Sequence, residues 1–366
     1  MAARVLVVSD YQHLLSVRPE AEIFLALHRG GTRVDVMTGG GSEYARRFRE
    51  AGMEVLDLRP PNRLDRPAIR RIREALLRGG HDVVFLMNNA AIRNGVWAAR
   101  GLPVKVVAYR GVVGNVHWWD PTSWLKILHP RIDRVLCNAE AVAEDVRRSL
   151  LSRREKVVTI HKCHDLAWYE GVRPADRASL GVPADAFAVA GVANVRRMKG
   201  LRYLLEATHL LSPASRVHLV LVGRGMDRPE FSRLIEASPL RERIHLLGFR
   251  EDPLPITAAC DAFVLPSIAG EGHPKAVVEA MALARPPILT DIPGPRGLVE
   301  DGVSGRVVPP GDPAAIAAAI RELASDPARA RRLGEAARER LRTRFRFGDT
   351  VRAVRALVEE LAAVRE

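Results

Sequence analysis

The chain has 366 residues, of which 47% are hydrophobic and 27% are charged. This length predicts two domains, each large enough to bury its own core, and the composition excludes disordered, collagen-like and low-complexity proteins. The formal net charge of +13 calls for an acidic partner, such as a phosphate group, a nucleic acid or an anionic membrane. Because 50 of the 56 basic residues are Arg, a compositional bias without any function is an equal explanation.

Three cysteines, Cys137, Cys163 and Cys260, have no CxxC spacing and form no disulfide framework. Together with an N-terminus that lacks a signal-peptide pattern, they predict a reducing, cytoplasmic location. No run approaches the roughly 18 apolar residues of a transmembrane helix, so the sequence predicts no membrane span. Contact with the surface of a membrane stays open.

Short β-branched runs alternate with amphipathic stretches along the chain, which is typical of βαβ units and parallel sheets. In the first half, the helical patterns include residues 66–78 and 139–150. The strands predicted there are 5–8, 33–37, 54–56, 83–87, 104–108, 134–137 and 156–160. These elements predict a complete doubly wound α/β domain in residues 1–165.

The segment 163–183 interrupts this pattern with glycines and prolines and carries no strand signal, so we expect the interdomain linker there. A second series of elements follows and predicts another α/β domain in residues 166–345. Its strands are expected at 188–192, 217–222, 244–247, 262–265, 287–290 and 305–308, and its helical patterns at 314–323 and from 327 onward.

The most informative pattern follows the predicted strand 262–265. Pro274 suits the first position of a helix, so the amides of 275–277 would face out of the helix N-terminus and form an anion site. Glu271 precedes this helix and Glu279 lies in its second turn; carboxylates on both sides of a phosphate site suit a sugar nucleotide. Two solvated surface glutamates are the alternative. The motif reads Glu271-Gly272-His273-Pro274-Lys275-Ala276.

The run from Glu271 to Gly302 resembles the retaining glycosyltransferase family 4, whose signature is two glutamates separated by seven residues. Residues 192–200, 221–225 and 247–250 extend the resemblance, which covers about 155–345; the earlier residues agree only in architecture. It implies the GT-B fold, an α/β fold of two Rossmann-like, doubly wound domains that face each other across a cleft. The first would bind the acceptor and the second the nucleotide sugar, with a helix in 346–366 crossing back to the first domain.

The resemblance also implies roles for single residues. Glu279 would bind the ribose hydroxyls and Glu271 the hydroxyls of the donor sugar. Lys199 matches the lysine that neutralises the diphosphate leaving group, and Arg196 is our candidate for the family's arginine, whose own position holds Asn194. The catalytic set is therefore Glu271, Lys199 and Arg196. The nucleotide-binding set is Glu279, Asn194, Gly223, Gly248, Phe249, Arg250, Gly272, His273, Pro274, Lys275 and Ala276, with Phe249 in the core as the alternative for that residue.

The first domain departs from the family. Gly39 and Gly40 follow its second strand rather than its first, and they suit either a phosphate cradle or a plain mobile loop. Arg110 stands where many relatives have histidine, and His117 is a candidate for acceptor or phosphate contact, although a lone histidine is more often structural. These four residues are the predicted acceptor site.

Trp118, Trp119 and Trp124 lie close together among basic residues. Such a cluster suits sugar stacking or contact with a membrane surface, and core packing is the alternative. The segment 161–165 has two histidines and a cysteine, but neighbouring residues in an extended segment point to opposite sides. It resembles the family's hinge, and no Asp-x-Asp occurs in the chain, so we expect neither a metal nor another cofactor.

The sequence thus predicts a metal-independent, retaining hexosyltransferase that uses a nucleoside diphosphate sugar, UDP first and GDP next. The expected acceptor is a hydroxyl group of a glycan or lipid-linked molecule in bacterial lipopolysaccharide or capsule synthesis, at the inner face of the cytoplasmic membrane. The alternatives are a GT-B sugar-nucleotide epimerase and a nicotinamide-dependent oxidoreductase, for which residues 223–228 lack the third glycine. No nucleic-acid partner is expected, because the basic residues form no stripe.

Overall fold

The computed structural model describes residues 3–12 and 14–364, apart from the side chain of Ser16. The chain divides into two compact units. Unit 1 comprises Met1–Cys163 and Phe347–Glu366, and unit 2 comprises His164–Arg346. Unit 1 is therefore built from both ends of the chain, whereas unit 2 is continuous.

The described residues of unit 1 form one sheet of seven parallel strands in the order β3-β2-β1-β4-β5-β6-β7. Strand β1 contributes Val5 and Val7 to one core and Leu6 and Val8 to another, because a parallel sheet between two helical layers buries both faces. The strands are β1 (Arg4–Val8), β2 (Arg33–Thr38), β3 (Val55–Asp57), β4 (Val83–Leu86), β5 (Lys105–Arg110), β6 (Arg134–Cys137) and β7 (Val157–Thr159).

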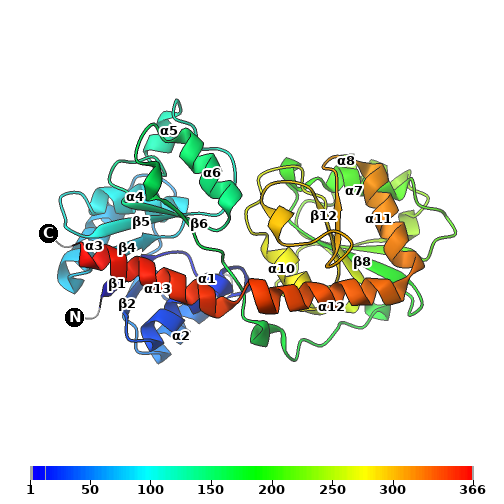
Figure 1. Ribbon diagram of the computed structural model, residues 1–366, viewed down its shortest axis with the longest axis horizontal. Coiled ribbons are helices and arrows are strands. Elements are labelled where there is room, and N and C mark those ends of the chain that lie inside the picture. The colour runs from blue at the N-terminus through cyan, green and yellow to red at the C-terminus, as the bar shows by residue number, and fades with distance from the viewer. Residues whose placement is uncertain (1–2, 13, 365–366) are drawn as a thin grey trace. The chain divides into compact units, whose positions relative to one another are not determined.

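The last helix of the chain completes the core of unit 1. Helix α13 (Phe347–Ala363) packs against α1 (Leu14–Arg29), as Figure 1 shows. Its Leu357 and Val358 are buried in the same core as Val5 and Val7. The other helices of unit 1 are α2 (Glu43–Glu50), α3 (Arg66–Gly79), α4 (Asn89–Ala98), α5 (Pro121–Trp124), α6 (Glu140–Ser149) and the 3-10 helix η1 (Arg154–Lys156).

The described residues of unit 2 form a sheet of six parallel strands in the order β10-β9-β8-β11-β12-β13. The strands are β8 (Phe187–Val192), β9 (Val217–Val222), β10 (Ile244–Leu246), β11 (Ala262–Leu265), β12 (Pro287–Thr290) and β13 (Arg306–Val308). The α-helices are α7 (Leu201–Thr208), α8 (Pro229–Glu236), α9 (Leu254–Ala259), α10 (Lys275–Ala282), α11 (Pro313–Ser325) and α12 (Pro327–Arg344). The 3-10 helices are η2 (Leu166–Tyr169), η3 (Ala178–Leu180), η4 (Arg197–Lys199), η5 (Arg241–Arg243) and η6 (Pro295–Gly297).

Each sheet has a point at which the order of its strands reverses. In unit 2 the chain runs from β8 outward to β10 and then returns to β11, which lies on the other side of β8. In unit 1 the same reversal occurs between β1 and β4. Loops that leave the carboxyl ends of such neighbouring strands diverge, and the crevice between them is where ligands bind in open α/β sheets.

The predicted α/β fold with two parallel sheets is confirmed. Every predicted strand is present, and its ends differ from the prediction by at most two residues. The three cysteines are buried and free, and burial raises the pKa of Cys137 and of Cys260 to about 12. Across residues 3–12 and 14–364, no helix combines the length and the apolar character that a membrane crossing requires.

We expect Leu357→Ala to lower the free energy of unfolding of unit 1 by about 2–5 kcal/mol, because it opens a cavity where α13 meets the sheet. Urea unfolding followed by circular dichroism measures the change. Leu77→Ala removes the same atoms from a leucine that is 60% exposed on α3 and serves as the control. Equal effects of the two substitutions would contradict the packing of α13.

Candidate functional site

The strongest candidate site lies at the carboxyl edge of the unit 2 sheet, where the strand order reverses. Lys199 ends η4 in the loop that follows β8, and Glu271 lies in the loop that follows β11. The Lys199 Nζ atom is 2.6 Å from Glu271 Oε1, and the Glu271 side chain is only 7% exposed. The sequence predicted both residues for the donor site, and the structure brings them into an ion pair.

The two loops meet through their backbones. The Ile268 amide donates a hydrogen bond of 2.8 Å to the Met198 carbonyl. Gly200 has φ = +65°, and a Cβ atom there would overlap the carbonyl oxygen of Pro266. Only glycine combines this backbone conformation with so close an approach. Gly200, the residue after Lys199, therefore helps to hold Lys199 beside Glu271.

Ser267 is a residue of this site to which the sequence analysis gave no role. Its hydroxyl donates a 2.6 Å hydrogen bond to Glu271 Oε1, and its carbonyl accepts a hydrogen bond from the hydroxyl of Thr290 at the end of β12. Ser267 is 1% exposed. The available signal was a serine two residues after the end of a buried strand, at the carboxyl edge of the sheet.

The start of α10 differs from the prediction in one respect. Pro274 has ψ = 113° and precedes the helix as its N-cap, so its expected place as the first helical residue is wrong. The Val277 amide donates to the Pro274 carbonyl at 3.1 Å, so it is not available to an anion. Of the three amides predicted to face outward, those of Lys275 and Ala276 donate to no group in the described part of the chain.

Glu279 forms an ion pair with Lys275 one turn earlier on α10. Glutamate and lysine four residues apart are neighbours on a helix surface, so the spacing itself indicated this pair. The side chains of Glu271 and Glu279 are 7% and 6% exposed, respectively. The alternative interpretation of both as solvated surface glutamates is therefore wrong.

Three of the predicted nucleotide-binding residues, Asn194, Gly223 and Gly248, lie on the loops that follow β8, β9 and β10. The Arg224 amide donates to Asn194 Oδ1 at 2.9 Å, and the Arg224 guanidinium lies 4.3 Å from the centre of the Phe249 ring. The Gly223 amide donates to the Gly248 carbonyl at 2.9 Å. Phe249 is 45% exposed, so core packing does not describe it.

The remaining predicted residues of unit 2 lie on these same loops. Arg196 precedes η4, and both Arg196 and Arg250 are exposed. Gly272 is buried beside Glu271, and the ring of half-buried His273 packs against the ring of Phe345 at 5.6 Å between centres. The structure thus gathers the predicted nucleotide-binding residues on the loops at one edge of the unit 2 sheet and in the first two turns of α10.

The predicted acceptor residues of unit 1 have structural contacts of their own. Arg110 donates to the carbonyls of Val112 and Gly114, and its burial lowers the pKa of its guanidinium. The Gly40 amide donates to Asp57 at 2.8 Å, so this amide is already satisfied by a carboxylate. A role in acceptor binding stays a prediction for Arg110, Gly39 and Gly40.

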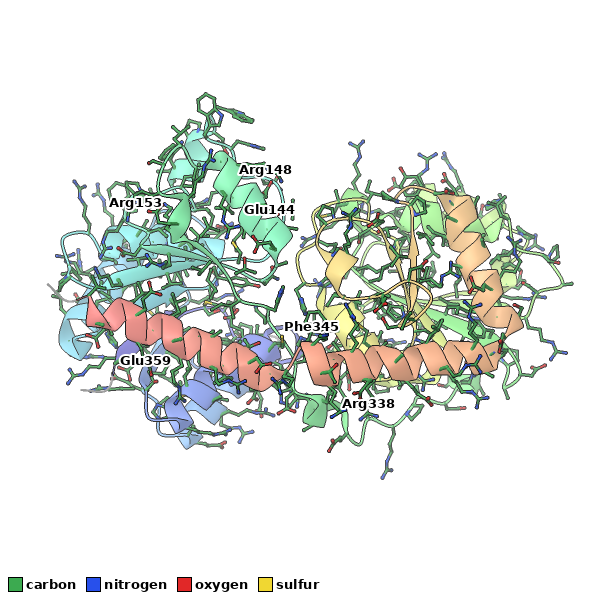
Figure 2. The ribbon with its side chains drawn as sticks, in the orientation of Figure 1. Glu144, Arg148, Arg153, Arg338, Phe345 and Glu359 are labelled. Atoms are coloured by element: carbon green, nitrogen blue, oxygen red, sulfur yellow. The ribbon has the colours of Figure 1, made fainter. Side chains whose placement is uncertain are left out.

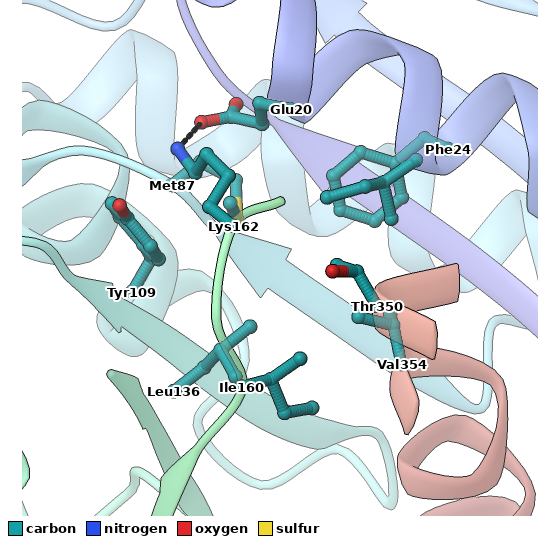
Figure 3. A pocket seen from close by; sticks show the side chains of 10 residues that line it. Glu20, Phe24, Met87, Tyr109, Leu136, Ile160, Lys162, Thr350 and Val354 are labelled. Atoms are coloured by element: carbon teal, nitrogen blue, oxygen red, sulfur yellow. Dashed lines mark hydrogen bonds and ion pairs between the residues drawn. The ribbon is translucent and has the colours of Figure 1, made fainter. Parts of the chain in front are cut away.

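The segment 161–165 brings a lysine to the carboxyl edge of the unit 1 sheet. Lys162 lies 3.4 Å from Glu20 of α1 and 4.2 Å from the centre of the Tyr109 ring (Figure 3). These groups border a cavity of about 20 Å³, which is room for one water molecule. Within the described residues, no group of three or more His, Cys, Asp or Glu side chains is placed to hold a metal ion.

The tryptophan cluster, Trp118, Trp119 and Trp124, lies on the surface of unit 1. The three side chains are exposed by 51%, 63% and 38%, respectively, so core packing is wrong for all three. The His117 ring stacks on Trp119 with 4.5 Å between ring centres, and the Trp124 indole N–H donates to the Trp118 carbonyl at 2.7 Å. His117 thus supports an exposed aromatic ring.

Both halves of the chain match known protein families. Residues 172–340 match the family model described as Glycosyl transferases group 1, and residues 21–168 match the model described as Glycosyltransferase Family 4. Two similar curated proteins are the lipopolysaccharide core biosynthesis glycosyltransferases LpsD and LpsE of Rhizobium meliloti. LpsD is 34% identical over 47% of this chain and 49% of its own length, and LpsE is 30% identical over 58% and 60%. The chain therefore spans about half to three fifths of these relatives.

Solved structures with a similar fold cover nearly the whole chain. A glycosyltransferase from Rickettsia africae has a TM-score of 0.82 and 17% identity over 98% of each chain. Anabaena Alr3699/HepE, solved in complex with UDP and glucose, has a TM-score of 0.80 and 19% identity over 98% of this chain and 100% of its own. At these identities the likeness shows the GT-B fold.

We expect Gly200→Ala to destabilise unit 2 more than Gly302→Ala does. Gly302 has a similar φ of +72° and open space around it, so its substitution costs only the backbone strain of about 1–2 kcal/mol. At Gly200 the overlap with the Pro266 carbonyl adds about 1–3 kcal/mol. Chemical denaturation of both variants gives the difference, and equal losses would show that the two loops are not tightly joined.

Proposed function

Because the chain belongs to glycosyltransferase family 4, we propose that it transfers a hexose from a nucleoside diphosphate sugar to a hydroxyl group of a glycan or lipid-linked acceptor. The observation that carries this proposal is the pairing of Lys199 with Glu271 and of Lys275 with Glu279 at one edge of the sheet. Ammonium groups suit a diphosphate, and buried carboxylates suit the hydroxyls of sugars. A sugar nucleotide offers both.

The proposal gives each charged group a separate task. Glu279 accepts hydrogen bonds from the ribose, Glu271 accepts one from a hydroxyl of the donor sugar, and Lys199 contacts the diphosphate. Arg196, exposed before η4, adds a second positive charge beside the phosphates. The remaining contacts to the nucleotide come from Asn194, Gly223, Gly248, Phe249, Arg250, Gly272, His273, Pro274, Lys275 and Ala276.

Cleavage of the glycosidic bond moves negative charge onto the departing diphosphate. A lysine already in place there stabilises the transition state, and the two available amides at the start of α10 add partial positive charge. The diphosphate then leaves from the face that the acceptor hydroxyl attacks, and a phosphate oxygen takes the acceptor's proton. This route retains the configuration and requires neither a protein nucleophile nor a bound metal or cofactor.

We place the reaction in the synthesis of a bacterial cell-envelope polysaccharide, a lipopolysaccharide or a capsule, in the cytoplasm at the inner face of the membrane. Support comes from the names of the two Rhizobium relatives. UDP is the first candidate for the nucleotide, and the UDP complex of the Anabaena protein supports it. GDP is the second.

The tryptophan cluster is our candidate for contact with an anionic membrane. The Ser149 hydroxyl donates to the Val116 carbonyl at 2.6 Å, which ties the segment before the cluster to the end of α6. Arg148 on α6 and Arg153 after it are exposed, and Figure 2 labels both. Indole rings favour the membrane interface, and each basic residue near anionic lipids adds about 1 kcal/mol.

Thermal shifts with UDP, GDP, ADP and TDP and their sugars test the donor site. A ligand at 100 times its Kd stabilises the folded protein by about 2.7 kcal/mol. We expect Glu279→Ala and Lys199→Ala to lose most of this stabilisation, and Lys199→Ala to lower transfer by about 100- to 1,000-fold. Glu335→Ala on the exposed side of α12 is the control. Unchanged transfer in both site variants would refute the assignment.

Sedimentation with lipid vesicles tests the membrane contact. We expect the wild-type protein to bind vesicles with 30% anionic lipid more tightly than neutral vesicles, because the exposed Arg148 lies on α6, to which the segment before the tryptophans is bonded. Replacing Trp118, Trp119 and Trp124 together by Ala removes this binding, whereas Leu77→Ala, at an exposed site on α3, keeps it. Normal vesicle binding with a raised KM for the acceptor would instead assign the cluster to sugar stacking.

A further inference from the structure

The two oxygens of the Glu271 carboxylate have different surroundings. Lys199 Nζ and Ser267 Oγ both lie 2.6 Å from Oε1. Oε2 accepts no hydrogen bond from the described part of the chain and is not sealed off from solvent. One oxygen is thus held by the protein, and the other is open to a ligand.

We propose that Ser267 is a positioning residue for the donor sugar, because its hydroxyl holds Oε1 of Glu271 so that Oε2 faces a hydroxyl of that sugar. This inference rests on the proposed function. Ser267 itself is held firmly: it is almost fully buried, and the Thr290 hydroxyl donates to its carbonyl. Its neighbour Ile268 donates to the loop that carries Lys199.

The need for a second donor follows from the task given to Lys199. When a diphosphate binds, its negative charge competes with Glu271 for the lysine ammonium group. A buried carboxylate that loses its only partner is strongly disfavoured and would turn toward solvent or toward another cation. The Ser267 hydroxyl carries no charge and belongs to an almost fully buried residue, so it stays with Oε1 while the lysine moves toward the phosphates.

Ser267→Ala tests this role, with the nucleotide sugar that stabilises the wild-type protein most and with its nucleoside diphosphate as probes. We expect kcat to fall by about 10- to 100-fold, because a displacement of about 1 Å in a reacting group can cost on the order of 100-fold. The affinity for the nucleoside diphosphate should stay within about twofold. The additional affinity that the sugar provides should disappear, an effect that a merely structural role would not produce.

Ser238→Ala is the matched control, because Ser238 is also buried in unit 2 and its hydroxyl bonds to Thr208 at 2.7 Å, away from the site. We expect it to change stability without changing kcat. If the Ala variant unfolds, Ser267→Cys keeps a hydrogen-bond donor at this position, although a weaker and somewhat larger one, and we expect a partial loss of kcat.

The outcomes separate this inference from the proposed function. Wild-type kcat and sugar-dependent affinity in the Ser267 variants, with Glu271→Ala inactive, would overturn the positioning role alone. Normal transfer by both Glu271→Ala and Lys199→Ala, or no binding of any nucleotide sugar by the wild-type protein, would overturn both. Loss of nucleoside diphosphate binding in Ser267→Ala would also overturn the positioning role, because it would show that the whole loop has collapsed.

Discussion

The site in unit 2 depends on the burial of Glu271. A carboxylate that is 7% exposed is stable only beside a positive charge and hydrogen-bond donors, and Lys199 and Ser267 supply both. This requirement brings together the loops that carry Lys199 and Glu271, two residues that are 72 positions apart in the chain. The close approach of Gly200 to Pro266 and the hydrogen bond from Ile268 to Met198 join the same two loops through their backbones. The geometry of the edge is thus set mainly by the surroundings of one side chain.

Lys199 and Lys275 each pair with a glutamate of the motif. Such pairing lets four charged groups share a partly buried edge without an isolated charge. The proposed diphosphate would compete with the carboxylates for the same ammonium groups, so donor affinity would be a difference between two sets of ionic contacts. Both carboxylates can then accept hydrogen bonds from hydroxyl groups, which carry no charge.

Hydrophobic periodicity was enough to predict the strands, because buried parallel strands form apolar runs bounded by turns. The resemblance also placed Glu271 and Lys199 on loops at one edge of this sheet and Glu279 in the helix that follows Glu271. It could not predict the bond from Ser267 to Glu271, which depends on side-chain direction after a strand has ended. The exposure of Trp118, Trp119 and Trp124 could not be predicted either, because a run of aromatic residues has the same sequence pattern in a core and on a surface.

Unit 1 takes its last helix from the far end of the chain, so its assembly order differs from its order of synthesis. Residues 4–159 supply the whole of its sheet early, but the apolar face that receives Leu357 and Val358 stays uncovered until residues 347–363 have been made. Unit 2, being continuous, has all of its residues before then. Because synthesis proceeds at about 5–20 residues per second, the face of unit 1 that α13 covers stays exposed for on the order of ten seconds or more. During that interval a nascent chain would be open to chaperones and to aggregation.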